Sequence, residues 1–155
     1  MIDFGIITVS DTRTEVTDKS GQYIQRAMEE TGNNFIKKYI VKDDAQQITD
    51  AYNKLLTTSC KLILVNGGTG IARRDVTIDT LEPKFIKVIP GFGEYFRRIS
   101  VDDIGLKALV SGAAAGITDS DQICYLLPGS TNACKTALKK IILPDLEHLI
   151  KEITK

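Results

Sequence analysis

Residues 62–77 read L-I-L-V-N-G-G-T-G-I-A-R-R-D-V-T, an apolar run that ends in a glycine-rich corner. Four consecutive apolar residues, Leu62 to Val65, are typical of a strand that is buried on both faces of a parallel sheet. The glycines allow positive φ and let a ligand approach the backbone closely. The stretch therefore predicts a buried strand and a tight turn into a helix, the basic unit of an α/β fold.

Further strands and helices alternate on both sides of this stretch. Short apolar runs predict strands at residues 4–10, 35–41 and 123–127. Between and after them, apolar residues recur at helical spacing, namely Ile24, Ala27 and Met28, then Ile48, Ala51, Tyr52, Leu55 and Leu56, and finally Leu146, Leu149, Ile150 and Ile153. The pattern predicts an α/β fold, a three-layer sandwich with a mostly parallel central sheet and helices on both faces.

Several residues mark the ends of these helices. Gly32 predicts the end of the first helix, Asp44 is a candidate N-cap of the second, and Pro144 suits the first turn of the last. The segment P-G-F-G-E at 90–94 predicts another helix, which opens at Glu94 and turns three side chains inward, those of Tyr95, Phe96 and Ile99.

Composition bounds the class of protein. With 155 residues, 43% hydrophobic and 26% charged, the chain is expected to form one domain, residues 1–155. No apolar run approaches the roughly 20 residues of a membrane helix, and no basic segment precedes a long apolar one at the start, so we expect a cytoplasmic protein. Lys plus Arg and Asp plus Glu both number 20, so no bulk charge favours nucleic acid or an anionic membrane.

Cysteine and histidine usage excludes several kinds of site. Cys60, Cys124 and Cys134 are odd in number and lack CxxC spacing, so we expect buried reduced thiols rather than disulfides or a zinc site. The one histidine, His148, is expected at a partly exposed helix position near the C-terminus. Catalysis by a serine–histidine or cysteine–histidine pair is therefore not expected.

Four predicted strand ends carry small, polar or acidic residues. Ligands of open parallel sheets lie outside the carboxyl ends of the strands, because loops and helix N-termini converge there. We therefore expect one crevice lined by V-S-D-T-R at 9–13, V-K-D-D at 41–44, V-N-G-G-T-G at 65–70 and L-P-G-S-T at 127–131.

The glycine-rich corner is a candidate phosphate site. Successive amides that lead into a helix can form an anion-binding nest, and hydroxyl and guanidinium groups follow closely. The candidate residues are Gly67, Gly68, Thr69, Gly70, Arg73, Arg74 and Thr77. The alternative is a tight turn with exposed arginines. The corner matches neither GxxxxGK[ST] nor GxGxxG, so a P-loop or a dinucleotide fingerprint is not supported.

Carboxylates near this corner are candidate magnesium ligands. Phosphates in the cell usually arrive with Mg²⁺, which takes one or two carboxylates and completes its shell with phosphate and water. Asp43 and Asp75 follow neighbouring crevice loops and are the first candidates, although either could instead be a helix cap. Asp11, Asp44 and Asp79 are further candidates.

The chain carries four motifs that together resemble one family. They are V-S-D at 9–11, G-G-T-G-I-A-R-R-D-V-T at 67–77, P-G-F-G-E-Y-F-R at 90–97 and L-P-G-S-T at 127–131. In their order and spacing they resemble the molybdopterin-binding MogA/MoaB family and are similar also to the G domain of gephyrin. The resemblance runs through nearly the whole chain.

The resemblance implies Mg-ATP-dependent adenylylation of molybdopterin, in which AMP is transferred to the terminal phosphate and pyrophosphate is released. It also implies a homo-oligomer, a trimer or a hexamer, and contact with other proteins of molybdenum cofactor biosynthesis. By resemblance, Asp43 and Asp75 match the functional carboxylates of the family and would hold magnesium and the ATP phosphates.

Further residues are expected in the crevice wall, the two at 94 and 111 because of the resemblance and the others because they lie in the loops that follow the strands. These are Ser10, Asp11, Glu94, Ser111, Pro128, Gly129, Ser130 and Thr131. Two positions depart from the family pattern: Lys42 stands before Asp43 where a proline is common, and Gly112 follows Ser111 where an arginine is common.

Two other functions stay open. The chain could bind molybdopterin or assemble with other cofactor proteins without transferring a group. It could instead be a nucleotide pyrophosphatase, because the N-terminal domain of the CinA family resembles the same fold.

Overall fold

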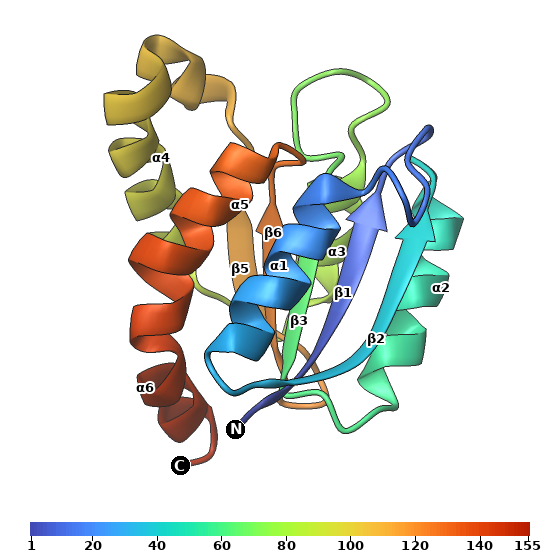
Figure 1. Ribbon diagram of the computed structural model, residues 1–155, viewed down its shortest axis with the longest axis vertical. Helices are drawn as coiled ribbons and strands as arrows, with labels where there is room; N and C mark the ends of the chain where they lie inside the picture. Colours follow the sequence, from blue (N-terminus) through green and yellow to red (C-terminus); the bar gives the residue numbers. More distant parts are fainter.

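One six-stranded sheet, in the order β2-β1-β3-β6-β5-β4, forms the centre of the structure, a computed structural model that describes residues 1–155 (Figure 1). The strands are β1 (Asp3–Val9), β2 (Asn34–Val41), β3 (Leu62–Asn66), β4 (Lys87–Val88), β5 (Ala114–Ile117) and β6 (Ile123–Leu127). Strands β2, β1, β3 and β6 are parallel, while β5 pairs antiparallel with both β6 and β4. The predicted mostly parallel sheet is confirmed.

Helices cover both faces of this sheet, as predicted. They are α1 (Lys19–Glu30), α2 (Ala45–Leu56), α3 (Thr77–Leu81), α4 (Pro90–Ile104), α5 (Thr131–Ala137) and α6 (Leu143–Ile153), with short turns η1 (Glu82–Lys84), η2 (Gly105–Val110) and η3 (Leu138–Ile142). Figure 1 shows α1 and α5 in front of the sheet and α3 behind it, with α2 at the right beside β2. Both termini lie at the end of the molecule opposite the arrowheads of β1 and β2.

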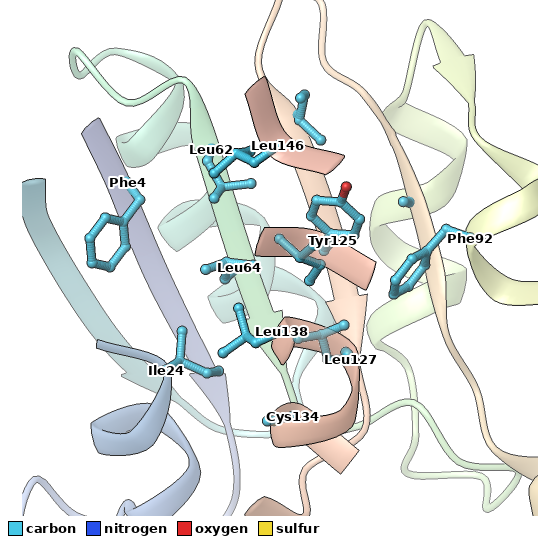
Figure 2. Packing of buried hydrophobic residues seen from close by; sticks show 14 of the residues in the cluster. Phe4, Ile24, Leu62, Leu64, Phe92, Tyr125, Leu127, Cys134, Leu138 and Leu146 are labelled. Carbon is cyan, nitrogen blue, oxygen red and sulfur yellow. The ribbon is translucent and has the colours of Figure 1, made fainter. Parts of the chain in front are cut away.

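The sheet separates two hydrophobic cores, and strand β3 contributes to both. Its successive side chains point to opposite faces of the sheet. Leu62 and Leu64 pack into the core under α1, α4, α5 and α6, which Figure 2 shows from close by. Ile63 and Val65 pack into the opposite core, under α2 and α3. All five residues of β3 are buried, as the continuous apolar run predicted.

Helix boundaries follow the predicted signals at Asp44, Gly32 and Pro144. Asp44 caps α2, since its side chain accepts a hydrogen bond from Gln47 N at 2.9 Å. Gly32 has φ 84° just after α1. Pro144 lies in the first turn of α6, as predicted, although α6 continues directly from α5 through the π-helical turn η3.

Helix α4 starts earlier and is rotated relative to the prediction. It begins at Pro90, so the inward stripe consists of Phe92, Phe96 and Ser100, each one turn apart. Tyr95 is therefore half exposed, and its predicted inward position is wrong.

The cysteines and the histidine lie as predicted. All three thiols are free and buried, and burial raises the pKa of the Cys134 thiol to about 12, which leaves it protonated and unreactive. His148 is exposed on α6 beside Asp145, and Figure 1 shows α6 toward the end of the molecule where both termini lie. None of the helices has the length and apolar character required to cross a membrane.

Candidate functional site

The predicted crevice exists at the carboxyl ends of the parallel strands. A first hollow of about 180 Å³ receives residues from all four predicted loops. Its lining residues are Val9, Ser10, Asp11, Thr12, Arg13, Asp43, Gly67, Gly68, Arg74, Asp75 and Gly129. Because β2, β1, β3 and β6 are parallel neighbours, their following loops emerge at one edge, at the top of Figure 1.

The glycine-rich corner is held in a conformation that requires glycine. Gly67 has φ 101° and Gly68 has φ 67°, and a Cβ at Gly67 would overlap the carbonyl oxygen of Val9. Thr77 holds the corner in place through two hydrogen bonds. Its buried hydroxyl donates to Gly67 O at 2.8 Å, and its N–H donates to Gly68 O at 3.0 Å. The hydroxyl of Thr77 is thus used within the protein, which corrects its predicted role as a phosphate ligand.

The amides that follow are free to bind an anion. The N–H groups of Gly68, Thr69, Gly70 and Ile71 donate to no acceptor within the protein, whereas the next amide, that of Ala72, donates to Asp75 Oδ2 at 2.9 Å. Several consecutive unpaired amides in a glycine-rich loop favour a phosphate-sized anion.

Three carboxylates, Asp11, Asp43 and Asp75, surround the first hollow, and we call them the mouth carboxylates. Asp43 N donates to Asp11 Oδ1 at 3.0 Å, which holds the loops after β1 and β2 together. Burial raises the pKa of the Asp43 carboxyl above its ordinary value, the charge of Asp11 raises it further, and Arg74 opposes the rise. Neither Asp43 nor Asp75 caps a helix, because α2 is capped by Asp44 and the N-cap position of α3 is Val76.

Arginine side chains supply the positive charge of the first hollow. Arg74 lines it, whereas its neighbour Arg73 lines neither hollow of the crevice, although both arginines are exposed. Arg13 belongs to the predicted loop at 9–13 but was given no individual role; it also lines the hollow, and its Nη2 donates to Gly129 O at 2.7 Å. Its partner is 116 residues away in the sequence, so local pattern could not identify the contact. The only available signal was an arginine in a loop after a strand.

A buried polar cluster, which we call the floor network, supports Arg13. At its centre Asp18 is fully buried and caps α1 through Gly21 N at 3.0 Å. The carboxylate accepts a hydrogen bond from the Thr8 hydroxyl at 2.8 Å and pairs with Lys38 Nζ at 3.2 Å. The network also contains Arg13, Ser20 and Asn66.

A second hollow of about 290 Å³ lies on the other side of the glycine-rich corner. Its lining residues are Gly68, Thr69, Gly70, Ile71, Asp75, Ile78, Asp79, Arg97, Leu109, Val110, Ser111 and Gly112. Gly68 and Asp75 line both hollows and therefore form their shared wall. Ser111 lies in the second hollow, and Arg97 is a second cation that the sequence did not single out.

Several predicted residues have other positions or roles. Glu94 lines a separate pocket between α4 and β5 and neither hollow of the crevice. Because α4 begins at Pro90, Glu94 lies within the helix rather than at its start. Ser130 caps α5 by accepting a hydrogen bond from Ala133 N at 3.1 Å. Pro128 O accepts from Cys134 Sγ at 3.3 Å, and Thr131 begins α5. Of the loop after β6, only Gly129 lines a hollow.

Ser10 acts mainly on its own loop, because its Oγ accepts hydrogen bonds from Thr12 N at 3.3 Å and Arg13 N at 3.1 Å. This turn sets the direction in which Arg13 leaves β1. Ser10 nevertheless lines the first hollow, as predicted.

The donor set fits a magnesium ion that is shared with phosphates. The structure has no cluster of three or more His, Cys, Asp or Glu side chains with metal-site geometry. Asp43 and Asp75 offer carboxylate oxygens at the rim, and Mg²⁺ needs only one or two of them when phosphates complete its shell. A divalent cation would also offset the negative charge that raises the pKa of Asp43.

Comparison with known proteins agrees with this geometry. Residues 5–148 match the family described as "Probable molybdopterin binding domain". The chain is 45% identical over 157 residues to the molybdenum cofactor biosynthesis protein B of Staphylococcus carnosus (strain TM300), which covers 99% of this chain and 92% of that protein.

Solved structures of similar proteins have the same fold. A crystal structure of a molybdenum cofactor biosynthesis protein B matches with a TM-score of 0.95 and 41% identity, over 99% of this chain and 96% of that chain. The tungsten cofactor synthesizing protein MoaB from Pyrococcus furiosus matches with a TM-score of 0.91 and 34% identity, over 99% and 98% of the two chains. The chain therefore belongs to the molybdopterin-binding MogA/MoaB family.

Proposed function

We propose that this protein acts in molybdenum cofactor biosynthesis as a molybdopterin adenylyltransferase, which transfers AMP from Mg-ATP to the terminal phosphate of molybdopterin. The family match and the names of its relatives support molybdopterin as the ligand. The observation that carries the transfer reaction is the pair of hollows with a shared wall at Gly68 and Asp75. Each of two phosphate-bearing substrates can fill one hollow while their phosphates meet at this wall.

The reaction is an in-line displacement at phosphorus. An oxygen of the terminal phosphate of molybdopterin attacks the α-phosphorus of ATP, a new P–O bond forms, and the bond to the β-phosphate breaks to release pyrophosphate. Catalysis of this kind depends on positioning and on offsetting charge. No histidine is needed, because a phosphate monoester with its second pKa near about 6 is already anionic at neutral pH.

The residues of the crevice have corresponding roles. The free amides from Gly68 to Ile71 bind phosphate oxygens, and Arg13 and Arg74 neutralise the polyphosphate. Asp43 and Asp75 would hold Mg²⁺, which when bound would offset the negative charge of the phosphates. Thr77 and the floor network keep these groups in place before the substrates bind.

The test is a reaction of the purified chain with molybdopterin, ATP and Mg²⁺, followed by mass detection of the products. We expect adenylylated molybdopterin and pyrophosphate in equal amounts, and neither when molybdopterin is omitted. Binding of molybdopterin without any product would contradict the transfer and leave a binding protein. Cleavage of ATP or ADP-ribose without any pterin would contradict it in favour of a nucleotide pyrophosphatase.

A further inference from the structure

A separate cavity lies at the end of the molecule away from the crevice, and we call it the terminal pocket. It has a volume of about 300 Å³ and is bounded by the start of β1, the end of α1 and one side of α6. Figure 1 marks the N-terminus beside α6 at this end, opposite the arrowheads of β1 and β2. The terminal pocket shares no lining residue with either hollow of the crevice, so it is a distinct site.

The lining of the terminal pocket is mainly apolar. Leu146 is 3% exposed, and Ile2, Leu143 and Ile150 pack against the same core from partly exposed positions. Small-molecule sites are mostly apolar, with a few polar groups that fix the ligand, and have volumes from about 300 to 1,000 Å³. The terminal pocket is at the lower end of this range and therefore suits one compact apolar group.

The polar residues on the α1 side of the pocket are held by the fold. Asn33 Oδ1 accepts a hydrogen bond from Ile2 N at 3.1 Å, and Asn33 Nδ2 donates to Met28 O at 3.3 Å. The Thr31 hydroxyl donates to Met28 O at 2.9 Å. These bonds join the start of β1 to the end of α1 and fix this wall of the pocket. The selection of a ligand is therefore left to the charged groups on α6.

Glu147 and Lys151 are the charged residues of the terminal pocket, one turn apart on α6. Neither takes part in an ion pair, although side chains four residues apart on a helix are neighbours. Both are exposed, so a ligand can reach them from solvent. The other titratable side chains from the start of α6 to the C-terminus pair with one another, namely Asp145, His148, Glu152 and Lys155.

A carboxylate and an ammonium group at the same pocket favour a ligand that carries both charges. Glu147 would repel a simple anion, and Lys151 would repel a simple cation. An α-amino acid has its ammonium and carboxylate groups on one carbon atom, so it can pair with both residues at once. Its side chain then supplies the compact apolar group that the pocket suits.

We propose that the terminal pocket binds a free α-amino acid with an apolar side chain of the size of leucine. The ammonium group of the ligand pairs with Glu147, its carboxylate pairs with Lys151, and its side chain lies among Ile2, Leu146 and Ile150. Because the pocket is separate from the crevice, this binding does not depend on the proposed function.

Titration of the whole chain with L-leucine, followed by the NMR shifts of backbone amides, tests the proposal. We expect saturable shifts in α6 and at residues 31–33. Glu147→Gln and Lys151→Gln should each weaken binding about tenfold, as for loss of a charged hydrogen bond. Glu152→Gln and Lys155→Gln are the matched controls, since these residues lie near the C-terminus but do not line the pocket, and they should leave the affinity unchanged.

Two analogues with one charge each separate the contributions of the two pairs. 4-Methylpentanoate lacks the ammonium group and isopentylamine lacks the carboxylate, so each should bind about tenfold more weakly than L-leucine. Glycine, which lacks the apolar group, should cause no saturable shift.

Four results would overturn the proposal. They are the absence of saturable shifts with L-leucine, equal affinity in the two variants and the two controls, and equal affinity for L-leucine and its analogues. The fourth is a change of molecular mass in Glu147→Gln or Lys151→Gln by sedimentation, because the pocket would then be a contact between copies of the chain.

Discussion

The floor network and the mouth carboxylates both concentrate acidic groups at one edge of the sheet, yet their charge is balanced differently. In the floor network, Asp18 is fully buried and receives hydrogen bonds from Thr8 and Gly21 and a salt bridge from Lys38. Among the mouth carboxylates, the backbone N–H of Asp43 is hydrogen-bonded to Asp11, and the pKa of the Asp43 carboxyl is raised. Arg74 is the one positive charge that opposes this rise. A charged group that stabilises the fold has its hydrogen-bond and ion-pair partners within the protein. A group that binds a charged ligand lacks some of these partners in the free protein.

This difference separates two kinds of mutational effect. Changes in the floor network should reduce the free energy of unfolding, and changes at the mouth should reduce transfer with little effect on unfolding. The predictions below test this separation, in order of decreasing expected effect.

Asp18→Ala should cost about 3 kcal/mol of unfolding free energy, because it leaves Lys38 and the Thr8 hydroxyl without their buried partner. Urea denaturation measures the change. Glu15→Ala is the matched control, since Glu15 is the other carboxylate at Lys38, at 3.2 Å, but its side chain is 72% exposed. It should cost less than about 0.5 kcal/mol, and equal costs in the two variants would contradict the distinction.

Asp75→Asn should reduce the transfer rate about 100-fold or more, by analogy with the loss of one preorganised electrostatic group. The amide oxygen can still accept the hydrogen bond from Ala72 N, so the unfolding free energy should change by less than about 0.5 kcal/mol. Steady-state kinetics and denaturation on the same sample measure both. Full activity in this variant would remove Asp75 from the site.

Arg74→Gln should raise the KM for ATP about tenfold, because one charged hydrogen bond to phosphate is lost. Arg73→Gln, at the adjacent position that lines neither hollow, should leave the KM within about twofold, as surface changes usually do. Kinetics at varied ATP concentration compare the two. A larger effect at Arg73 would reverse the assignment between the neighbours.

Asp11→Asn should lower the pKa of Asp43 toward its ordinary value of 3.8, since one neighbouring negative charge is removed. The amide oxygen can still accept the hydrogen bond from Asp43 N. Titration of the Asp43 carboxyl by NMR measures the shift. An unchanged pKa would mean that Asp11 does not contribute to the charge at the mouth.

Much of the fold could be predicted from sequence because its signals are local. The run Leu62 to Val65 indicated a strand buried on both sides, and Asp44 indicated a helix start. Strand β4 has only two residues, too few for any periodic pattern. The start of α4 at Pro90 was missed because the glycines at 91 and 93 suggest a turn, although the helix includes them.

The site could be predicted where its residues directly follow a strand or belong to the glycine-rich corner. It could not be predicted where contacts between residues far apart in the sequence determine the position of a side chain. Gly67, Gly68, Asp43 and Asp75 meet in the crevice because parallel strands bring their loops together. Arg13 and Arg97 bind carbonyl oxygens of Gly129 and Ala113, which only the folded chain brings near. Thr77 and Ser130 were assigned to ligands because their bonds to the backbone cannot be read from composition.

The most direct test of the account is one paired measurement on Asp43→Asn: the transfer rate, and the unfolding free energy as a function of pH. Because the pKa of Asp43 is raised in the folded state, its ionisation destabilises the fold as pH rises from 3.8 through the folded pKa. The account predicts a variant that loses transfer yet is more stable than the wild type at pH 7, by less than about 1 kcal/mol for this partly solvated group, with the difference vanishing below pH 3.8. A variant that loses stability at pH 7 together with activity would contradict it, because Asp43 would then serve the fold and not the ligand.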